Sequence, residues 1–171
     1  MRFIFFFLFL LIQCGSSQEF RQTVPKVDLN RFMGKWYVIA SRPTSFEEGA
    51  YNAIEIYTYN QERDQIDIQF TFNKDSLTGP VKSIPQTGYI IDRENNSYWK
   101  VSPFWPLKFD YLIIDLESSY QWSVIGVPDQ KYIWIMARTP TLPETTYNQI
   151  LERVKGLGYN LSNLKKIENK P

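Results

Sequence analysis

The sequence of 171 residues contains no histidine and a single cysteine, Cys14. Without histidine, the chain cannot form a histidine-dependent catalytic triad, a Cys–His nucleophile pair or a histidine-rich metal site. With one cysteine, it cannot form an internal disulfide. We therefore assign no catalytic residue, no metal site and no cofactor. If the domain is exported, its stability must come from its core and sheet closure, which favours a bacterial envelope over the animal secretory pathway.

The chain also lacks an excess of charge of either sign. It carries 19 lysine and arginine residues against 18 aspartate and glutamate residues, and removing the residues before Cys14 leaves 18 of each. A neutral chain has no electrostatic footprint for nucleic acid, so we expect no nucleic-acid partner. Aromatic residues make up 16% of the chain, which favours strands and an apolar pocket over disorder. The length predicts one domain.

The apolar run at residues 3–12 is too short to cross a bilayer as a helix. Ten residues of helix rise about 15 Å, roughly half of the hydrocarbon thickness. The basic Arg2, the short apolar run and the small polar residues after it indicate an export signal. The segment LIQC at 11–14 resembles the lipobox of bacterial lipoproteins, although Gln13 replaces the small residue that usually precedes the cysteine.

We therefore predict that residues 1–13 are a signal peptide, that Cys14 is lipidated, and that residues 14–27 tether a domain spanning residues 28–171. Three acyl chains, as such lipoproteins carry, exceed the two anchoring signals that stable attachment requires. This predicts a lipid-anchored protein of the bacterial outer membrane, with the membrane as a partner through Cys14. The alternative is an ordinary signal peptide with an incidental cysteine, and a soluble secreted or periplasmic protein.

Eight short segments with turn residues between them predict β-strands. Alternation is clearest at residues 65–72, where isoleucine and phenylalanine alternate with polar side chains. Short turns require antiparallel neighbours, which predicts an all-β fold: an eight-stranded up-and-down barrel of a size that holds one small ligand. The predicted strands are residues 36–42, 52–60, 65–72, 86–92, 98–104, 110–116, 120–127 and 131–137.

Two helical segments flank the strands. Asp28 is predicted to cap a short helical turn before Gly34. The segment TLPE at 141–144 has the spacing of a capping box, and Gly156 and Gly158 mark the end of a second helix. Because the strands at 110–116 and 131–137 are apolar on both faces, we predict that this C-terminal helix packs on the outside of the barrel. The weaker alternative is that its apolar stripe binds a partner or a membrane. The stripe consists of Tyr147, Ile150, Leu151, Val154 and Leu157.

An early tryptophan and a late arginine bracket the strands. Trp36 lies in GKWY at 34–37, and Arg138 lies in ARTP at 137–140. A guanidinium stacked on an indole closes the floor of a small barrel in an apolar setting. We therefore predict that Gly34, Trp36 and Arg138 form a structural barrel floor.

These segments resemble the lipocalin family, and within it the bacterial outer-membrane lipoprotein branch, which is similar to apolipoprotein D. The resemblance runs from about residue 28 to residue 159. It rests on the opening motif at 28–37, FEEG at 46–49, PDQKYIWI at 128–135 and ARTP at 137–140. Many lipocalins carry an aspartate ahead of a tyrosine before the seventh strand, where this chain has Glu117 and Tyr120. The resemblance implies a barrel open at one end, with an apolar lumen used for fatty acids, lysophospholipids or similar lipids.

The parity of the last strand selects the lumen residues. Arg138 must point inward to reach Trp36, so Trp134 and Met136 share its inward face. Glu55 lies on the face of Tyr57; it either enters the lumen, where it could hold a cationic headgroup, or lies outward in solvent, which we favour. Lys108 could meet a phosphate or carboxylate at the mouth. The alternative for the whole set is that the side chains simply fill the barrel. The candidate ligand-binding residues are Val38, Ala40, Glu55, Tyr57, Phe70, Tyr89, Lys108, Tyr111, Tyr132, Trp134 and Met136.

Three functions are compatible with this sequence. The first and preferred one is binding, storage or transport of lipids such as palmitate in the lumen, without enzyme activity. The second is a lipid-modifying enzyme on the same scaffold, in which only Tyr, Glu or Asp could supply acid–base chemistry. The third is a structural surface protein whose barrel is filled with side chains.

Overall fold

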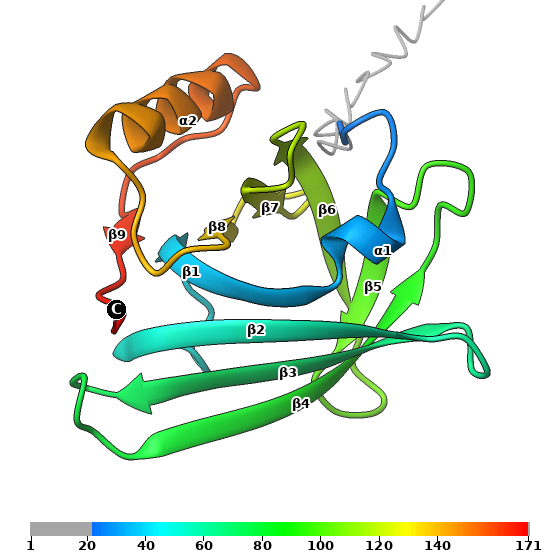
Figure 1. Cartoon of the computed structure of the whole chain (residues 1–171), viewed down its shortest axis with the longest axis horizontal. Helices are drawn as coiled ribbons and strands as arrows, with labels where there is room; N and C mark the ends of the chain where they lie inside the picture. The colour runs from blue at the N-terminus through cyan, green and yellow to red at the C-terminus, as the bar shows by residue number, and fades with distance from the viewer. Residues whose placement is uncertain (1–21, 171) are drawn as a thin grey trace, which may run out of the picture.

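The structure, a computed structural model, describes residues 22–170 and shows a closed antiparallel barrel with one long helix on its outside (Figure 1). The predicted signal peptide and Cys14 lie outside the described residues. The elements, in chain order, are α1 (Leu29–Phe32), β1 (Gly34–Arg42), β2 (Ala50–Asn60), β3 (Gln65–Lys74), β4 (Val81–Ile90), β5 (Tyr98–Ser102), β6 (Phe109–Leu116), β7 (Trp122–Gly126), β8 (Ile133–Ala137), α2 (Glu144–Gly156) and β9 (Lys165–Lys166).

Strands β1 to β8 pair in chain order, and β1 pairs with both β2 and β8, which closes the barrel. The predicted all-β class and eight-stranded up-and-down topology are therefore confirmed. A ninth strand, β9, was not predicted; its two residues pair with Ala40 and Ser41 on β1. Two residues carry no periodic signal, so the sequence pattern could not reveal this strand.

The predicted bounds of β4 were wrong. The prediction began at residue 86, whereas the strand begins at Val81 and ends at Ile90. Strand β5 pairs only with the half of β4 from Thr87 onward, so the outer edge of the first half is open. A proline is tolerated where no ladder hydrogen bond is required, and Pro85 lies in that open half.

Helix α2 packs on the outer wall of the barrel, as predicted. Tyr147, Ile150 and Val154 are buried against strands β6 and β8, while Leu151 and Leu157 are half-buried beside them. This packing excludes the alternative of a free stripe for a partner or a membrane. Figure 1 shows the helix lying over the side of the barrel that carries β1, β7 and β8.

Of the two predicted helix caps, the first is confirmed and the second was wrong. Asp28 caps α1, where its Oδ1 accepts hydrogen bonds from the backbone N–H groups of Asn30 and Arg31 at 2.9 and 3.2 Å. The capping box at 141–144 was wrong, because α2 has Pro143 at its N-cap and no side chain caps it. Pro143 has a φ of −54° and an extended ψ of 140°, so it lies outside the helix, which starts two residues later than the box spacing implies.

An aromatic core fills the closed half of the barrel. The rings of Phe32, Trp36, Tyr57 and Trp99 are all at most 1% exposed. Phe32 lies at the centre, with ring-centroid distances of 5.1 to 5.6 Å to the other three. We call this set the aromatic plug; it leaves room for a ligand only in the opposite half of the barrel.

Candidate functional site: a cavity in the open half of the barrel

A cavity of about 560 Å³ occupies the half of the barrel above the aromatic plug. Its mouth lies between the β1–β2, β5–β6 and β7–β8 loops, which contribute residues 44–47, 103–104, 108, 127–129 and 132 to the lining. Small-molecule sites typically enclose about 300 to 1,000 Å³. The alternative of a barrel filled solid with side chains is therefore wrong. The apolar wall between mouth and plug consists of Ile68, Phe70, Ile84, Val101, Ile125 and Met136.

A pair of tyrosines joins the cavity lining to the plug beneath it. The hydroxyls of Tyr57 and Tyr111 are hydrogen-bonded at 2.7 Å, and the Tyr57 hydroxyl also lies 3.9 Å from the sulfur of Met136. Burial, with a smaller contribution from the charge of Glu55, raises the pKa of Tyr111 well above its usual value. Because Tyr111 is neutral at ordinary pH, it can serve as a hydrogen-bonding base of the cavity.

The predicted floor is present at the other end of the barrel. The Arg138 guanidinium lies 3.7 Å above the Trp36 ring centroid. Its nitrogens donate to four backbone carbonyls, those of Arg31, Phe32, Lys35 and Tyr120, at 2.6 to 3.3 Å. Gly34 has a φ of +94°, and a Cβ there would lie 3.5 Å from Nη1 of Arg138, so a side chain at this position is strained. Burial lowers the pKa of Arg138.

The turn that departs from the lipocalin pattern is intact. The Glu117 carboxylate accepts hydrogen bonds from the backbone N–H groups of Ser119 and Gln121 at 2.8 and 3.2 Å. The bond to Ser119 contributes most to the lowered pKa of Glu117. Tyr120 then accepts a hydrogen bond from the backbone N–H of Asp28 at 2.9 Å, so the turn is tied to the segment that begins the domain.

Seven of the eleven predicted ligand-binding residues lie in the cavity lining. Trp134 and Met136 are there because the alternation that starts at Arg138 continues unbroken along β8. The structure thus brings together residues from four strands and two loops. The seven are Glu55, Phe70, Lys108, Tyr111, Tyr132, Trp134 and Met136.

Two of the other four residues lie elsewhere because strand parity changed. A bulge in the pairing of β1 with β8 between Val38 and Ala40 breaks the alternation, so Ala40 packs outside with Ile135 and α2. Val38 remains inside, packed against Phe70 and Phe72 beside the cavity.

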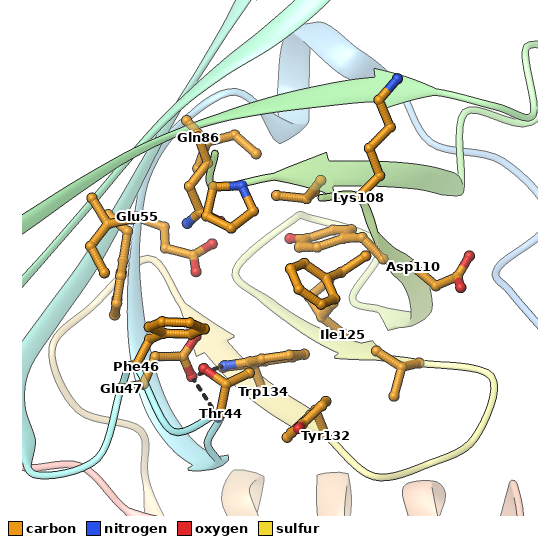
Figure 2. Close-up of a pocket in the computed structure, with 18 of the residues that line it drawn as sticks. Thr44, Phe46, Glu47, Glu55, Gln86, Lys108, Asp110, Ile125, Tyr132 and Trp134 are labelled. Carbon is orange, nitrogen blue, oxygen red and sulfur yellow. Dashed lines mark hydrogen bonds between the residues drawn. The ribbon is translucent and has the colours of Figure 1, made fainter. Parts of the chain in front are cut away.

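The remaining two, Tyr57 and Tyr89, also lie outside the cavity lining. Tyr57 belongs to the plug beneath the cavity. Tyr89 points out of the barrel, because the inner face of β4 carries Ile84 and Gln86. The Tyr89 ring carries the Lys108 ammonium on its face, 3.8 Å from the ring centroid. Figure 2 shows the Lys108 side chain directed away from the cavity.

Glu55 faces the cavity, so the solvated position favoured from the sequence was wrong. The residue is 8% exposed, and Figure 2 shows its carboxyl group directed into the open space. Among residues 22–170, no group donates a hydrogen bond to it and no cation pairs with it. Burial, assisted by the charge of Glu47, raises the pKa of Glu55 from 4.5 to about 8.

A second carboxylate, missed in the sequence, lies beside the first. Glu47, on the β1–β2 loop, accepts a hydrogen bond from Nε1 of Trp134 at 2.9 Å and one from the backbone N–H of Thr44 at 3.3 Å. Burial raises the pKa of Glu47, and these two hydrogen bonds oppose the rise. FEEG at 46–49 was noticed only as a family marker; a loop glutamate gives no sequence signal that it folds back into the barrel.

Exposed aromatic side chains surround the mouth. Phe46 and Phe104, each more than half exposed, meet edge to face across it with ring centroids 6.1 Å apart. Trp105 on the same β5–β6 loop is 86% exposed and precedes a cis proline, Pro106. These residues belong to the mouth but were not among the predicted site residues, because isolated aromatics in a loop show no periodicity.

The described residues offer few other features that point to chemistry. Within residues 22–170, no three metal-ligating side chains of His, Cys, Asp or Glu cluster together. In the same part of the chain, no helix has both the length and the apolar character to span a bilayer.

Comparisons with known proteins agree with this geometry. A family model described as a lipocalin-like domain matches residues 27–169. The chain is 27% identical over 167 residues to outer membrane lipoprotein Blc of Vibrio cholerae, covering 96% of each chain. It is 31% identical over 153 residues to apolipoprotein D of Macaca fascicularis, covering 80% of this chain and 77% of the relative. Insecticyanin of the tobacco hornworm Manduca sexta has the same fold, with a TM-score of 0.68 at 15% identity, covering 87% of this chain and 84% of that one.

Proposed function

The chain belongs to the lipocalin-like domain family, and from that premise we propose that it binds and carries a small hydrophobic ligand in the barrel cavity. The finer proposal is that the ligand is a single-chain lipid, either a fatty acid or a lysophospholipid. Lipocalin relatives are ligand carriers and not enzymes, which agrees with the prediction of a non-catalytic protein. The observation that carries the proposal is the cavity of about 560 Å³ between the aromatic plug and the mouth.

The apolar wall supplies enough free energy for such a ligand. Each buried methylene contributes about 0.8 kcal/mol, so a buried sixteen-carbon chain contributes roughly 12 kcal/mol. Association costs at least about 4 kcal/mol, and micromolar binding requires about 8 kcal/mol. Burial of the hydrocarbon alone therefore accounts for micromolar affinity, and the polar groups of the cavity are left to determine which lipid headgroup is accepted.

Trp134 provides the test of lipid binding. Its indole lies in the cavity wall and is hydrogen-bonded to Glu47, so a bound lipid changes its surroundings. We expect a saturable change in tryptophan fluorescence on titration with lysophospholipid or palmitate, and loss of most of that change in Trp134→Phe. Trp122→Phe is the matched control, because Trp122 packs on the outer wall beside α2. Absence of saturation with every single-chain lipid tested would contradict the proposal.

We further propose that the protein is a lipid-anchored component of the bacterial outer membrane. Its support is the lipobox-like LIQC segment and the similarity to a protein named outer membrane lipoprotein. On this proposal residues 1–13 are removed and Cys14 carries the acyl chains. The tether that begins at Cys14 ends before Val24, earlier than the predicted end at residue 27, because the Val24 N–H donates to the Ile113 carbonyl at 2.9 Å and Val27 is buried in the core. Expression in a Gram-negative host should place the protein in the outer-membrane fraction and Cys14→Ala in the soluble fraction. Equal fractionation of the two would instead support the soluble secreted or periplasmic alternative.

A further inference from the structure

Among residues 22–170, acidic side chains face into the cavity and no basic side chain does so. Five charged residues belong to its lining: Glu47, Glu55, Lys108, Asp110 and Asp129. Two of them, Glu47 and Glu55, direct their carboxyl groups into the space, as Figure 2 shows. The other three lie at the mouth and have partners outside the cavity.

Each of these three charged side chains has a partner that holds it away from the interior of the cavity. The Lys108 ammonium lies on the outer face of the Tyr89 ring. Asp110 forms an ion pair with Lys100 at 2.6 Å, and Figure 2 shows its carboxylate turned outward. Asp129 forms an ion pair with Lys131 at 3.0 Å. In the described part of the chain, the charged residues that direct their side chains into the lumen are therefore both acidic.

We propose that this cavity selects amphiphiles with a cationic head, and that it seats an ammonium group between Glu55 and Glu47 with the hydrocarbon tail along the apolar wall. The inference rests on the proposed function, because it assumes that the cavity binds a single-chain amphiphile. It names the headgroup chemistry: an alkylammonium, or a phospholipid head that ends in an ammonium, is preferred over a free carboxylate. Both kinds of ligand share a cationic group, and the inference concerns that group.

The partners of the two carboxyl groups determine where the cation sits. Glu47 already holds two hydrogen bonds, from Trp134 and Thr44, so its position is fixed. Glu55 has no such bond within residues 22–170, so it is the group that gains most from an incoming cation. Burial opposes the ionisation of Glu55, and a ligand ammonium beside the carboxylate offsets that cost.

Aromatic rings in the cavity lining can contribute cation–π interactions to a bound ammonium group. The indole of Trp134 donates a hydrogen bond to Glu47, and Phe46 precedes Glu47 on the same loop and lines the cavity. Tyr132 lies next to Trp134, with ring centroids 6.1 Å apart. A quaternary ammonium is attracted to the faces of such rings by about 0.5 to 2 kcal/mol each. A fatty-acid carboxylate meets the opposite situation, because it approaches two acidic groups and the negative faces of the rings.

Proton linkage gives the inference a distinctive signature. Because Glu55 has a pKa of about 8, most of it is protonated at pH 7 in the empty cavity. Binding a cation favours its ionised form, so the cation displaces a proton and its affinity rises with pH by up to about tenfold per pH unit below pH 8. Glu47, whose pKa is also raised, acts in the same direction.

Within residues 22–170, the other titratable groups around Glu55 do not change charge in a way that would cancel this rise of affinity with pH. Tyr111 faces it from β6, with a pKa raised well above the usual value, so it stays neutral in this range. Tyr57 lies below it on β2, and Tyr132 on the wall beyond Glu47. The rim charges Lys108, Asp110 and Asp129 are paired outside the cavity, as described above.

The test compares two ligands with the same tail and opposite heads. The affinities of dodecyltrimethylammonium and of laurate are measured by isothermal titration calorimetry at pH 6.0 and pH 8.5, below their micelle concentrations. We expect the ammonium ligand to bind at least tenfold more tightly than laurate at pH 8.5. We also expect its affinity to rise at least tenfold between the two pH values while that of laurate falls.

Charge-removing variants assign the effect to the two residues. Glu55→Gln keeps the size of the side chain, so it should reduce ammonium affinity at pH 8.5 at least tenfold and flatten its pH dependence, while laurate binding improves. Glu47→Gln should give a smaller loss of the same sign. Glu48→Gln is the matched control, because Glu48 is the exposed neighbour of Glu47 on the same loop. Circular dichroism checks that each variant is folded. If Glu55→Gln does not fold, Glu47→Gln still tests the inference.

The outcomes separate the two levels of the proposal. Equal affinity for both ligands, tighter binding of laurate, or an ammonium affinity unchanged in both glutamine variants would overturn the headgroup inference and leave lipid binding intact. Failure of both ligands to bind at either pH would remove the proposed function together with the inference.

Discussion

Replacing Glu55 by glutamine should stabilise the protein at high pH. The Glu55 carboxyl has a pKa of about 8 in the folded protein, against 4.5 for its ordinary value. Between these two values the folded protein holds a proton that the unfolded chain has lost. The free energy of unfolding therefore falls as the pH rises from about 4.5 to 8. The difference between the two pKa values corresponds to at most about 5 kcal/mol, and water reaching the cavity reduces this to roughly 2 to 5 kcal/mol.

The assay is urea unfolding followed by circular dichroism at pH 4, 6 and 9, for the wild type and for Glu55→Gln. At pH 4 the carboxyl is neutral in both states, so the two proteins should have similar free energies of unfolding. At pH 9 the variant should be more stable by roughly 2 to 5 kcal/mol. Glu48→Gln should show no such growth with pH. A difference between wild type and Glu55→Gln that stays constant from pH 4 to pH 9 would refute the argument that burial raises this pKa.

Three further substitutions test the structural contacts. Arg138→Met should destabilise the protein by about 2 to 4 kcal/mol in urea unfolding, because four backbone carbonyls lose their donor and the buried Trp36 ring loses its cation; a loss below about 1 kcal/mol would contradict the floor role. Asn169→Ala should cost about 1 to 3 kcal/mol, since the Asn169 amide bonds the backbone of Val38 and Ala53, and lipid affinity should not change. Arg153→Met should lower the melting temperature at pH 7, because it leaves the buried Asp115 carboxylate without its 2.6 Å partner; a variant as stable as wild type at that pH would refute this.

The sequence could predict what depends on local periodicity and chemistry. The stripe from Tyr147 to Leu157 repeats at helical spacing and needs an apolar partner, so its packing on the barrel wall followed from pattern alone. The stacking of Arg138 on Trp36 fixed the facing of β8 and with it the position of Trp134 in the cavity wall. Each of these inferences required only the alternation within one element.

Other features depended on pairing between elements, which one sequence does not display. The bulge next to Val38 is a property of how β1 pairs with β8, and it turned Ala40 to the outside although alternation placed it inside. The fold of the β1–β2 loop, which brings Glu47 back to Trp134, is a contact across 87 residues. Asn169 similarly binds β1 from 131 residues away, where no periodic pattern surrounds it.

The polarity of Glu55 led to the wrong prediction that its side chain lies outward in solvent. An ionisable residue on a strand is normally solvated, because burying a carboxylate without a partner costs free energy. The pairing of Glu55 with Trp36 on β1 and with Phe70 on β3 nevertheless fixes its inward face, and a one-residue shift would expose Tyr57 and its plug contacts to water. The packing of the plug is therefore strong enough to hold a carboxyl group in the cavity. A glutamine or leucine at this position would give the more stable barrel at neutral pH, so the glutamate is explained by the binding role that we propose for it and not by folding.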